Sequence, residues 1–203
     1  MIDLKAVAVD ALYLAALINP LSKVSVLLEF APEYRDRRFL WLTVESTAAA
    51  AGILLGVMIL GDWFLRSVFR VDLHSLRIAG GTVVFWVGLN ALRRGVFFEH
   101  DAHAHIQDIA LVPLACPMIA GPATIAACIG LKAEHGIWPS TLAMVIALGL
   151  NHLAMMLSPS IGRSLGRLNL FGPLIRLTGL IVMTIGTQMV LDGLAVWIAT
   201  HQR

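Results

Sequence analysis

Two long apolar segments of this chain are interrupted near their middle by proline. The first, Ala11 to Phe30, contains Asn19-Pro20, and the second, Ile109 to Leu131, contains Cys116-Pro117 and then Gly121-Pro122. A proline lacks a backbone donor and clashes with the preceding helical turn. In hydrocarbon no water replaces the lost hydrogen bond, so the freed groups must face protein, a bound molecule or a wet cavity. The paired breaks therefore constrain the fold more strongly than any other feature.

The composition places these segments in a membrane. Of 203 residues, 58% are hydrophobic and 14% are charged, and the mean hydropathy is +0.81. Soluble domains carry roughly 45–50% apolar and about 25% charged residues. The first apolar run is too long for a signal peptide and lacks a small-residue cleavage site. The net charge is +2 and the arginines are scattered among loops, which argues against a nucleic-acid partner.

We expect six helical spans, because about 20 mostly apolar residues cross a bilayer as a helix. Most of the charge lies in the connections between them, and no linker divides the chain, so we expect a single domain over residues 1–203. The predicted spans are Val7 to Phe30, Trp41 to Ile59, Leu76 to Leu92, Ile109 to Leu131, Trp138 to Leu157, and Leu174 to Ile198.

The two halves of the chain, about residues 1–95 and 106–203, look alike. Pro20 precedes Pro117 by 97 residues, as Trp41 precedes Trp138, and Arg77-Ile78-Ala79-Gly80 precedes the similar Arg176-Leu177-Thr178-Gly179 by 99. With three spans in each half, the halves insert upside down relative to each other. We therefore predict an all-α polytopic fold of two inverted three-helix repeats, with the first and fourth helices broken.

Three motifs carry a resemblance to a known family. The fourth span reads PLACPMIAGPA over residues 113–123, the third begins RIAGG at residue 77, and the sixth contains RLTGL at 176 and QMVLDGL at 188. These are similar to the PLAxPLLAGPG, RIAGG and RxxGL…QMxLxGL patterns of the MarC family of six-span membrane proteins. The resemblance covers most of the chain and implies transport of small neutral amino acids such as glycine or alanine.

One departure from that family concerns the first break. Where the family has NPxGxxP, this chain reads Asn19-Pro20-Leu21-Ser22-Lys23-Val24-Ser25, so a serine replaces the glycine, Ser25 replaces the second proline and a lysine has entered. The departure leaves the coupling ion open between H⁺ and Na⁺.

The breaks predict a binding site at mid-membrane. Asparagine is a favoured N-cap and proline fits the first helical position, so a second half-helix is expected to start at Asn19-Pro20 and another at Gly121-Pro122. In inverted halves, these two helix N-termini would point at each other. Each carries unpaired backbone N–H groups and a partial positive charge, so the space between them suits a carboxylate. Alternatively, both prolines only kink their helices. The predicted substrate site comprises Asn19, Pro20, Ser22, Lys23, Ser25, Pro117, Gly121, Pro122 and Thr124, the hydroxyls of Ser25 and Thr124 serving an amino group or a cation.

Lys23 is expected one turn inside the second half of the first span. Lysine near a bilayer centre is costly and usually functional. It either binds the substrate carboxylate or replaces a sodium ion and titrates; alternatively it snorkels to the interface. Glu45, at the start of the second span, either pairs with Lys23 or is solvated by headgroups.

Further polar residues lie within or near the spans. Asn90, Asn151, His152 and Gln188 are candidates for the transport pathway, although such groups more often bond neighbouring helices. His100, His103 and His105, with Asp101, form a cluster in the connection between the halves. These side chains are candidate ligands for Zn or Cu; alternatively, the cluster is a solvated connector. The small residues around Gly52 and Gly56 are expected to pack within the monomer rather than at a dimer seam.

Together these features predict a secondary transporter that uses alternating access and no cofactor. The alternatives are an exporter of amino acids or drugs with the same fold, or a membrane enzyme or metal-binding protein built on the histidine cluster. We expect no enzyme, because the chain contains no phosphate-binding loop, nucleophile elbow or zinc-protease motif.

The expected partners are a small-molecule substrate, the lipid bilayer and, at most, further copies of the chain. Slightly more Lys and Arg in the loops of the predicted cytoplasmic side favours an orientation with both termini outside. We expect the protein to lie in a bacterial inner membrane.

Overall fold

The computed structural model describes residues 3–30, 37–95, 97, 115–116, 118–167 and 170–201, and these ranges are helical with no strand. The helices are α1 (Leu4–Ile18), α2 (Pro20–Phe30), α3 (Arg37–Phe64), the π-helical turn η2 (Leu65–Phe69), α4 (Leu73–Arg94), α6 (Pro122–His135), α7 (Ile137–Met156), α8 (Ser158–Arg167) and α9 (Phe171–His201). The all-α prediction is therefore confirmed.

Five segments are long and apolar enough to cross a membrane within the part of the chain that the structure describes. They are Leu4–Leu28, Phe39–Val68, Leu73–Arg94, Ile137–Met156 and Phe171–Thr200, and they correspond to five of the six predicted spans. The remaining predicted span, Ile109 to Leu131, begins outside the described residues. Helix α6 covers its second half and continues to His135.

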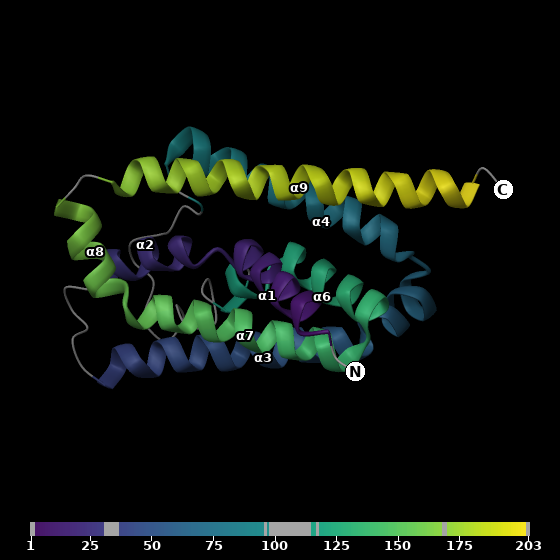
Figure 1. Cartoon of the computed structure of the whole chain (residues 1–203), viewed down its shortest axis with the longest axis horizontal. Helices are drawn as coiled ribbons and strands as arrows, with labels where there is room; N and C mark the ends of the chain where they lie inside the picture. The colour runs from purple at the N-terminus through teal and green to yellow at the C-terminus, as the bar shows by residue number, and fades with distance from the viewer. Residues whose placement is uncertain are drawn as a thin grey trace.

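The helices run lengthwise and alternate in direction (Figure 1). The line of α1 and α2 runs in the same direction as α4 and α7, while α3, α6 and α9 run the opposite way. The start of α1 and the end of α9 lie toward the same end of the molecule. Helices α6, α7 and α9 of the second half thus run opposite to α1–α2, α3 and α4 of the first, respectively.

The surface and the interior have the polarity expected of a membrane protein. Large apolar side chains such as Trp41, Trp86 and Trp138 are exposed, whereas Lys23 and Asn151 are fully buried. Lipid tails solvate an apolar surface without cost, while buried polar groups must find partners inside the protein. The polar interior is therefore where a site is to be sought.

Helices occupy much of three charged connections between the predicted spans. The connection after Asp62 continues α3 and then forms η2, Lys132 to His135 completes α6, and α8 occupies residues 158–167. Helix α8 packs against α2, and Gly162 lies beneath the Leu28 side chain. Arg163 and Arg167 are exposed on α8. Such an amphipathic helix suits the membrane surface, and its polar composition made it resemble a loop.

Helices α4 and α9 pack face to face along glycines spaced by seven residues. A Cβ added at Gly81 would lie 2.7 Å from the Gly186 carbonyl oxygen, and one at Gly88 would lie 2.6 Å from that of Gly179. From the first pair to the second, the residue number rises by seven on α4 and falls by seven on α9. The helices are therefore antiparallel and keep one register over both contacts. Small residues let helix backbones approach closely, which is the main source of packing energy between helices in lipid.

The remaining helices of the two halves interlock. Helix α1 packs against α7, and α6 packs against α3 and α4. The buried residues of α3 near this segment are Ala50, Leu54 and Met58, whereas Gly52 and Gly56 are exposed and have no atom within 4 Å of a Cβ position. The two glycines therefore do not pack within the monomer, whereas Ala50 is fully buried and Ala49 and Ala51 pack against the core, as expected for that part of the small-residue face.

Candidate functional site

The first break lies at Asn19. This residue has φ 53° and ψ 80°, and its backbone N–H donates to the Ala15 carbonyl at 2.9 Å, which ends α1. Its own carbonyl accepts from the Ser22 backbone N–H at 3.1 Å and from Ser22 Oγ at 2.7 Å. Asparagine tolerates the left-handed conformation better than most residues. The predicted break is present, but Asn19 is the C-cap of α1 rather than a side-chain N-cap of α2.

The second break lies at Ala120 and Gly121. The Ala120 N–H donates to the Ala115 carbonyl at 2.9 Å, an i to i−5 bond typical of a π-turn. Gly121 is extended, and α6 starts with Pro122 at its first helical position, as predicted. The amides of Ala123 and Thr124 have no acceptor within the helix, because the first turn of a helix lacks preceding carbonyls. Pro117 lies outside the described residues.

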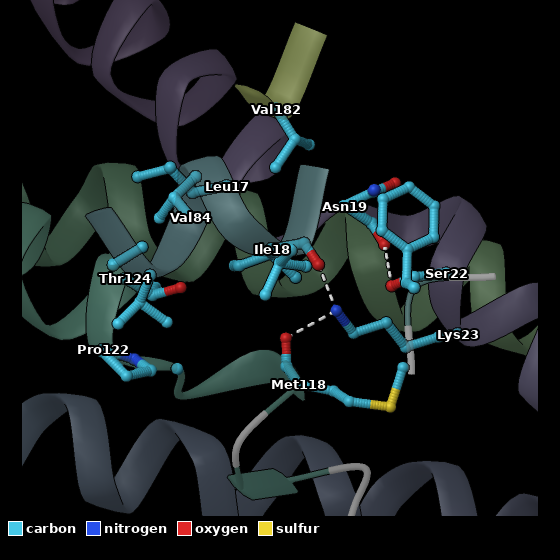
Figure 2. A pocket seen from close by; sticks show the side chains of 15 residues that line it. Leu17, Ile18, Asn19, Ser22, Lys23, Val84, Met118, Pro122, Thr124 and Val182 are labelled. Atoms are coloured by element: carbon cyan, nitrogen blue, oxygen red, sulfur yellow. Dashed lines mark hydrogen bonds between the residues drawn. The ribbon is translucent and has the colours of Figure 1, made fainter. Parts of the chain in front are cut away.

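Both breaks line one cavity of about 170 Å³, which we name the break cavity (Figure 2). Its polar lining comes from Asn19, Ser22, Lys23 and Thr124, and its remaining walls are mainly aliphatic. The described residues that line it are Leu17, Ile18, Asn19, Ser22, Lys23, Val83, Val84, Val87, Phe97, Met118, Gly121, Pro122, Ala123, Thr124 and Val182. The structure thus brings together most of the predicted site from segments about one hundred residues apart.

Lys23 is the charged residue among those described lining residues. Its side chain is fully buried, and its Nζ donates to the Ile18 carbonyl and, at 2.6 Å, to the Met118 carbonyl (Figure 2). The snorkelling alternative is therefore wrong. The predicted pair with Glu45 is also wrong, because Glu45 is exposed on α3 while Lys23 bonds to main-chain oxygens at the two breaks.

The cavity offers hydrogen-bond donors to a guest. Asn19 is 8% exposed, and its Nδ2 is buried without a hydrogen-bond partner. The uncapped start of α6 adds the amides of Ala123 and Thr124 and the positive end of the helix dipole. Buried donors without partners are costly, so this wall is complementary to an oxygen-rich anionic group.

The other predicted site residues lie elsewhere. Ser25 does not line the break cavity, and its Oγ donates to the Ser22 carbonyl at 2.8 Å. Asn151 Nδ2 contacts Met155 Sδ at 3.2 Å, and His152 Nδ1 lies 3.2 Å from Thr47 Oγ1 between α7 and α3. Asn90 is half-buried on α4 and lines neither cavity described here. These three pathway candidates are therefore not brought together with the breaks.

A second cavity, of about 280 Å³, lies between α1, α4, α6 and α9, and we name it the polar cavity. It contains Gln188, whose Nε2 donates to Asp192 Oδ1 at 2.7 Å. Its described lining residues are Val9, Asp10, Tyr13, Arg77, Ala126, Ala127, Gly130, Leu131, Glu134, Ile185, Gln188, Met189 and Asp192. Gln188, one of the predicted pathway candidates, thus lines the polar cavity.

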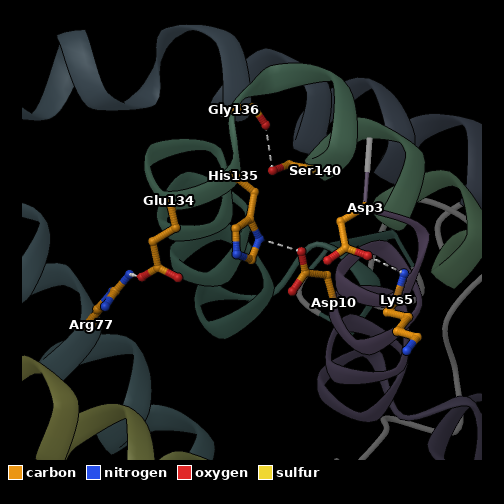
Figure 3. Close-up of polar contacts among 8 residues, drawn as sticks. All are labelled: Asp3, Lys5, Asp10, Arg77, Glu134, His135, Gly136 and Ser140. Atoms are coloured by element: carbon orange, nitrogen blue, oxygen red, sulfur yellow. Dashed lines mark hydrogen bonds and ion pairs between the residues drawn. The ribbon is translucent and has the colours of Figure 1, made fainter. Parts of the chain in front are cut away.

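Two polar side-chain pairs join helices at the polar cavity (Figure 3). His135 Nδ1 lies 2.6 Å from Asp10 Oδ2, which links α6 to α1, and the Arg77 guanidinium pairs with Glu134, which links α4 to α6. Sequence analysis missed this cluster, because its partners lie at span ends and far apart in the chain. The available signal was ionisable residues at the margins of apolar segments, above all Asp10 within the first one.

A close helix contact separates the two cavities. A Cβ at Gly80 would lie 3.3 Å from the Pro122 carbonyl oxygen and 3.2 Å from the Ala126 side chain. Helix α4 therefore lies tightly against α6 just beyond the second break.

The histidine cluster His100, His103 and His105 lies outside the described residues. Within those that the structure describes, no group of three His, Cys, Asp or Glu side chains is placed to hold a metal ion.

Comparisons with known proteins agree with the motifs. The model of the MarC family of integral membrane proteins matches residues 4–198. A UPF0056 membrane protein of Pyrococcus horikoshii is 33% identical over 190 residues, covering 94% of each chain. The UPF0056 inner membrane protein MarC of Citrobacter koseri is 29% identical over 229 residues, covering 99% of this chain and all of that one. No solved structure matches. This chain therefore belongs to the MarC family of integral membrane proteins.

Proposed function

We propose that this protein is a secondary transporter that carries small neutral amino acids, such as glycine and alanine, across a bacterial inner membrane. The observation that carries the proposal is the meeting of both helix breaks on one cavity. Broken helices in corresponding halves form the central site of many secondary transporters, with helix N-termini facing anionic groups of the substrate. Under this proposal residues 1–203 form one domain of two inverted repeats.

The chemistry of the break cavity suits a carboxylate. Asn19 Nδ2 and the first free amides of α6 donate hydrogen bonds, and Lys23 contributes positive charge nearby. The hydroxyls of Ser22 and Thr124, both buried, are acceptors for an amino group. No covalent step is required of these residues, so the proposed work is binding followed by exposure to the opposite side.

The size of the break cavity favours small solutes. An apolar cavity of about 150 Å³ holds benzene, which has six heavy atoms. Alanine also has six heavy atoms, so the 170 Å³ cavity suits alanine and amino acids whose aliphatic side chains are only slightly longer. The valines and Leu17 then surround the substrate side chain.

The alternating helix directions support the inverted-repeat part of the proposal. Counterpart helices of the halves run oppositely (Figure 1), and the first helix of each half packs against the second helix of the other. Inverted halves give a site near the membrane centre equivalent access from both sides.

Uptake into proteoliposomes tests the proposal. Purified protein should accumulate labelled glycine or alanine, and unlabelled amino acids should compete. Alaninamide, which lacks the carboxylate, should compete at least tenfold more weakly, because a charge-assisted hydrogen bond is worth about 1.5–3 kcal/mol. No accumulation across the amino-acid panel, or equal competition by acid and amide, would remove the proposed substrate class.

A further inference from the structure

We propose that the Lys23 ammonium is a built-in cation that occupies the ion position of this site, so that the two breaks are held together without a bound metal ion. The inference rests on the proposed function in one respect only, namely that the break cavity is the substrate site. It extends that function by assigning the ion requirement of the site.

The first step concerns the oxygens that Lys23 contacts. Ile18 is the last residue of α1, and the chain leaves the helix at Asn19, so the Ile18 carbonyl has no acceptor role within α1. Met118 lies in the turn before the second break, and its carbonyl points to the same nitrogen (Figure 2). Carbonyls freed at broken helices are the groups that coordinate sodium in transporters of this architecture.

The second step concerns the position of the charge. Lys23 belongs to the first turn of α2, and its side chain is fully buried. Its Nζ contacts the carbonyl of Ile18, five residues earlier in the chain, and that of Met118, 95 residues later. An ammonium is a compact point charge with three donors. It therefore satisfies the electrostatic requirement that a monovalent metal ion would satisfy at the same place.

The third step concerns exclusion of a mobile ion. No acidic side chain lines the break cavity among its described residues, so nothing there offsets a second positive charge. Two like charges a few ångströms apart in a low-dielectric interior repel strongly. Lys23 thus fills the space between the carbonyls and also raises the cost of binding sodium beside it.

Lys23 also positions the donors that a substrate meets. Its bonds to the Ile18 and Met118 carbonyls tie the end of α1 to the segment that precedes α6. Asn19 follows Ile18 directly, and Ala123 and Thr124 follow the second break. The fixed cation therefore holds both sets of donors toward one cavity, which a diffusible ion would do only when bound.

The test compares a variant that opens the ion position with one that keeps it filled. Lys23→Ala removes both charge and bulk, and Lys23→Met removes the charge while retaining a side chain of similar length. Thermal stability of the purified proteins is measured in sodium chloride, methylammonium chloride and choline chloride at equal ionic strength, and binding of alanine is measured alongside. Lys132→Ala is the matched control, because Lys132 Nζ also donates to a main-chain carbonyl, that of Ile59 at 2.9 Å, away from both cavities.

The wild-type protein should have the same melting temperature in sodium and choline. In choline, Lys23→Ala should bind alanine at least about tenfold more weakly, because two buried carbonyls lose their partner. Sodium or methylammonium should restore the stability of Lys23→Ala but not of Lys23→Met. The Lys132→Ala variant should show no specific response to either cation.

Specific stabilisation of the wild type by sodium would overturn the inference, and so would a Lys23→Ala variant that no small cation stabilises. If that variant does not fold, binding of radioactive sodium to the wild type decides the matter: saturable binding contradicts a built-in cation, and its absence is the expected result. These stability and ion-binding measurements need no transport. Absence of amino-acid uptake would therefore overturn the proposed function and leave the assignment of Lys23 to be decided by its own result.

Discussion

The break cavity and the polar cavity both lie along α1, α4, α6 and α9, with α2 also lining the break cavity, yet their charges are balanced in different ways. In the break cavity a fully buried lysine bonds to main-chain carbonyls that the helix breaks release. At the polar cavity Arg77 pairs with Glu134, and Asp10 contacts His135, through side chains that are mostly part-exposed. Backbone partners are fixed by the fold, whereas exposed side-chain pairs contribute little energy and rearrange easily. The comparison indicates that the polar contacts of the break cavity are more rigid than those of the polar cavity.

The two cavities share the α4–α9 wall, so damage to that wall should produce the largest effect. At Gly88 an added Cβ would lie 2.5 Å from the Met183 backbone nitrogen. Gly88→Val should separate the helices and destabilise the protein by about 3 kcal/mol or more, at the upper end for overpacking. Gly149→Val on α7 is the control, because nothing lies within 4 Å of its Cβ position. Equal melting temperatures for the two variants would contradict the glycine pairing.

A substitution at Asn19 should affect the break cavity alone. Asn19→Gly removes the unpaired Nδ2 but keeps a residue that adopts positive φ without strain, whereas Asn19→Ala also introduces about 1–2 kcal/mol of backbone strain. Both variants should lose roughly tenfold in affinity for alanine, equivalent to about 1.4 kcal/mol, and only the alanine variant should also lose that much stability. Calorimetric titration together with thermal melting separates the two effects. Retained affinity in Asn19→Gly would exclude the side chain from the site.

The smallest effect is expected at the polar cavity. Arg77→Gln and Glu134→Gln each remove one member of a part-exposed pair, so stability should change by no more than about 1 kcal/mol. Affinity for alanine at the break cavity should stay within about twofold, while the transport rate should become less sensitive to salt, because screening acts on exposed charges. A tenfold loss of affinity in either variant would mean that the two cavities are not separate in function.

Much of this arrangement was predictable from the residues. Proline chemistry located both breaks, because a missing N–H has the same consequence in any helix, and the presence of Lys23 in an apolar segment pointed to the site. The partners of Lys23 were not predictable, since the Ile18 and Met118 carbonyls are main-chain groups that every residue possesses. The pairing with Glu45 failed because sequence position does not reveal which face of α3 meets the lipid.

The polar cavity illustrates a different obstacle. Asp10 and His135 are 125 residues apart, and each lies where an apolar segment approaches a polar one. Only the packing of α1 on α6 brings them together, and that packing depends on side-chain fit along both helices. In contrast, the seven-residue spacing of Gly179, Gly186 and Gly193 is visible in the sequence and is typical of a close helix neighbour, although no prediction was based on it.

The glycine seam between α4 and α9 has a mechanical consequence. Because backbones touch along most of its length, the seam cannot slide or open without breaking many contacts at once, so the pair behaves as a stiff lever. Helix α4, with 22 residues, is about 33 Å long. A tilt of only about 10° would displace one end relative to the other by roughly 6 Å, with no rearrangement inside the pair. Such leverage would let a small rotation widen one cavity while it narrows the other.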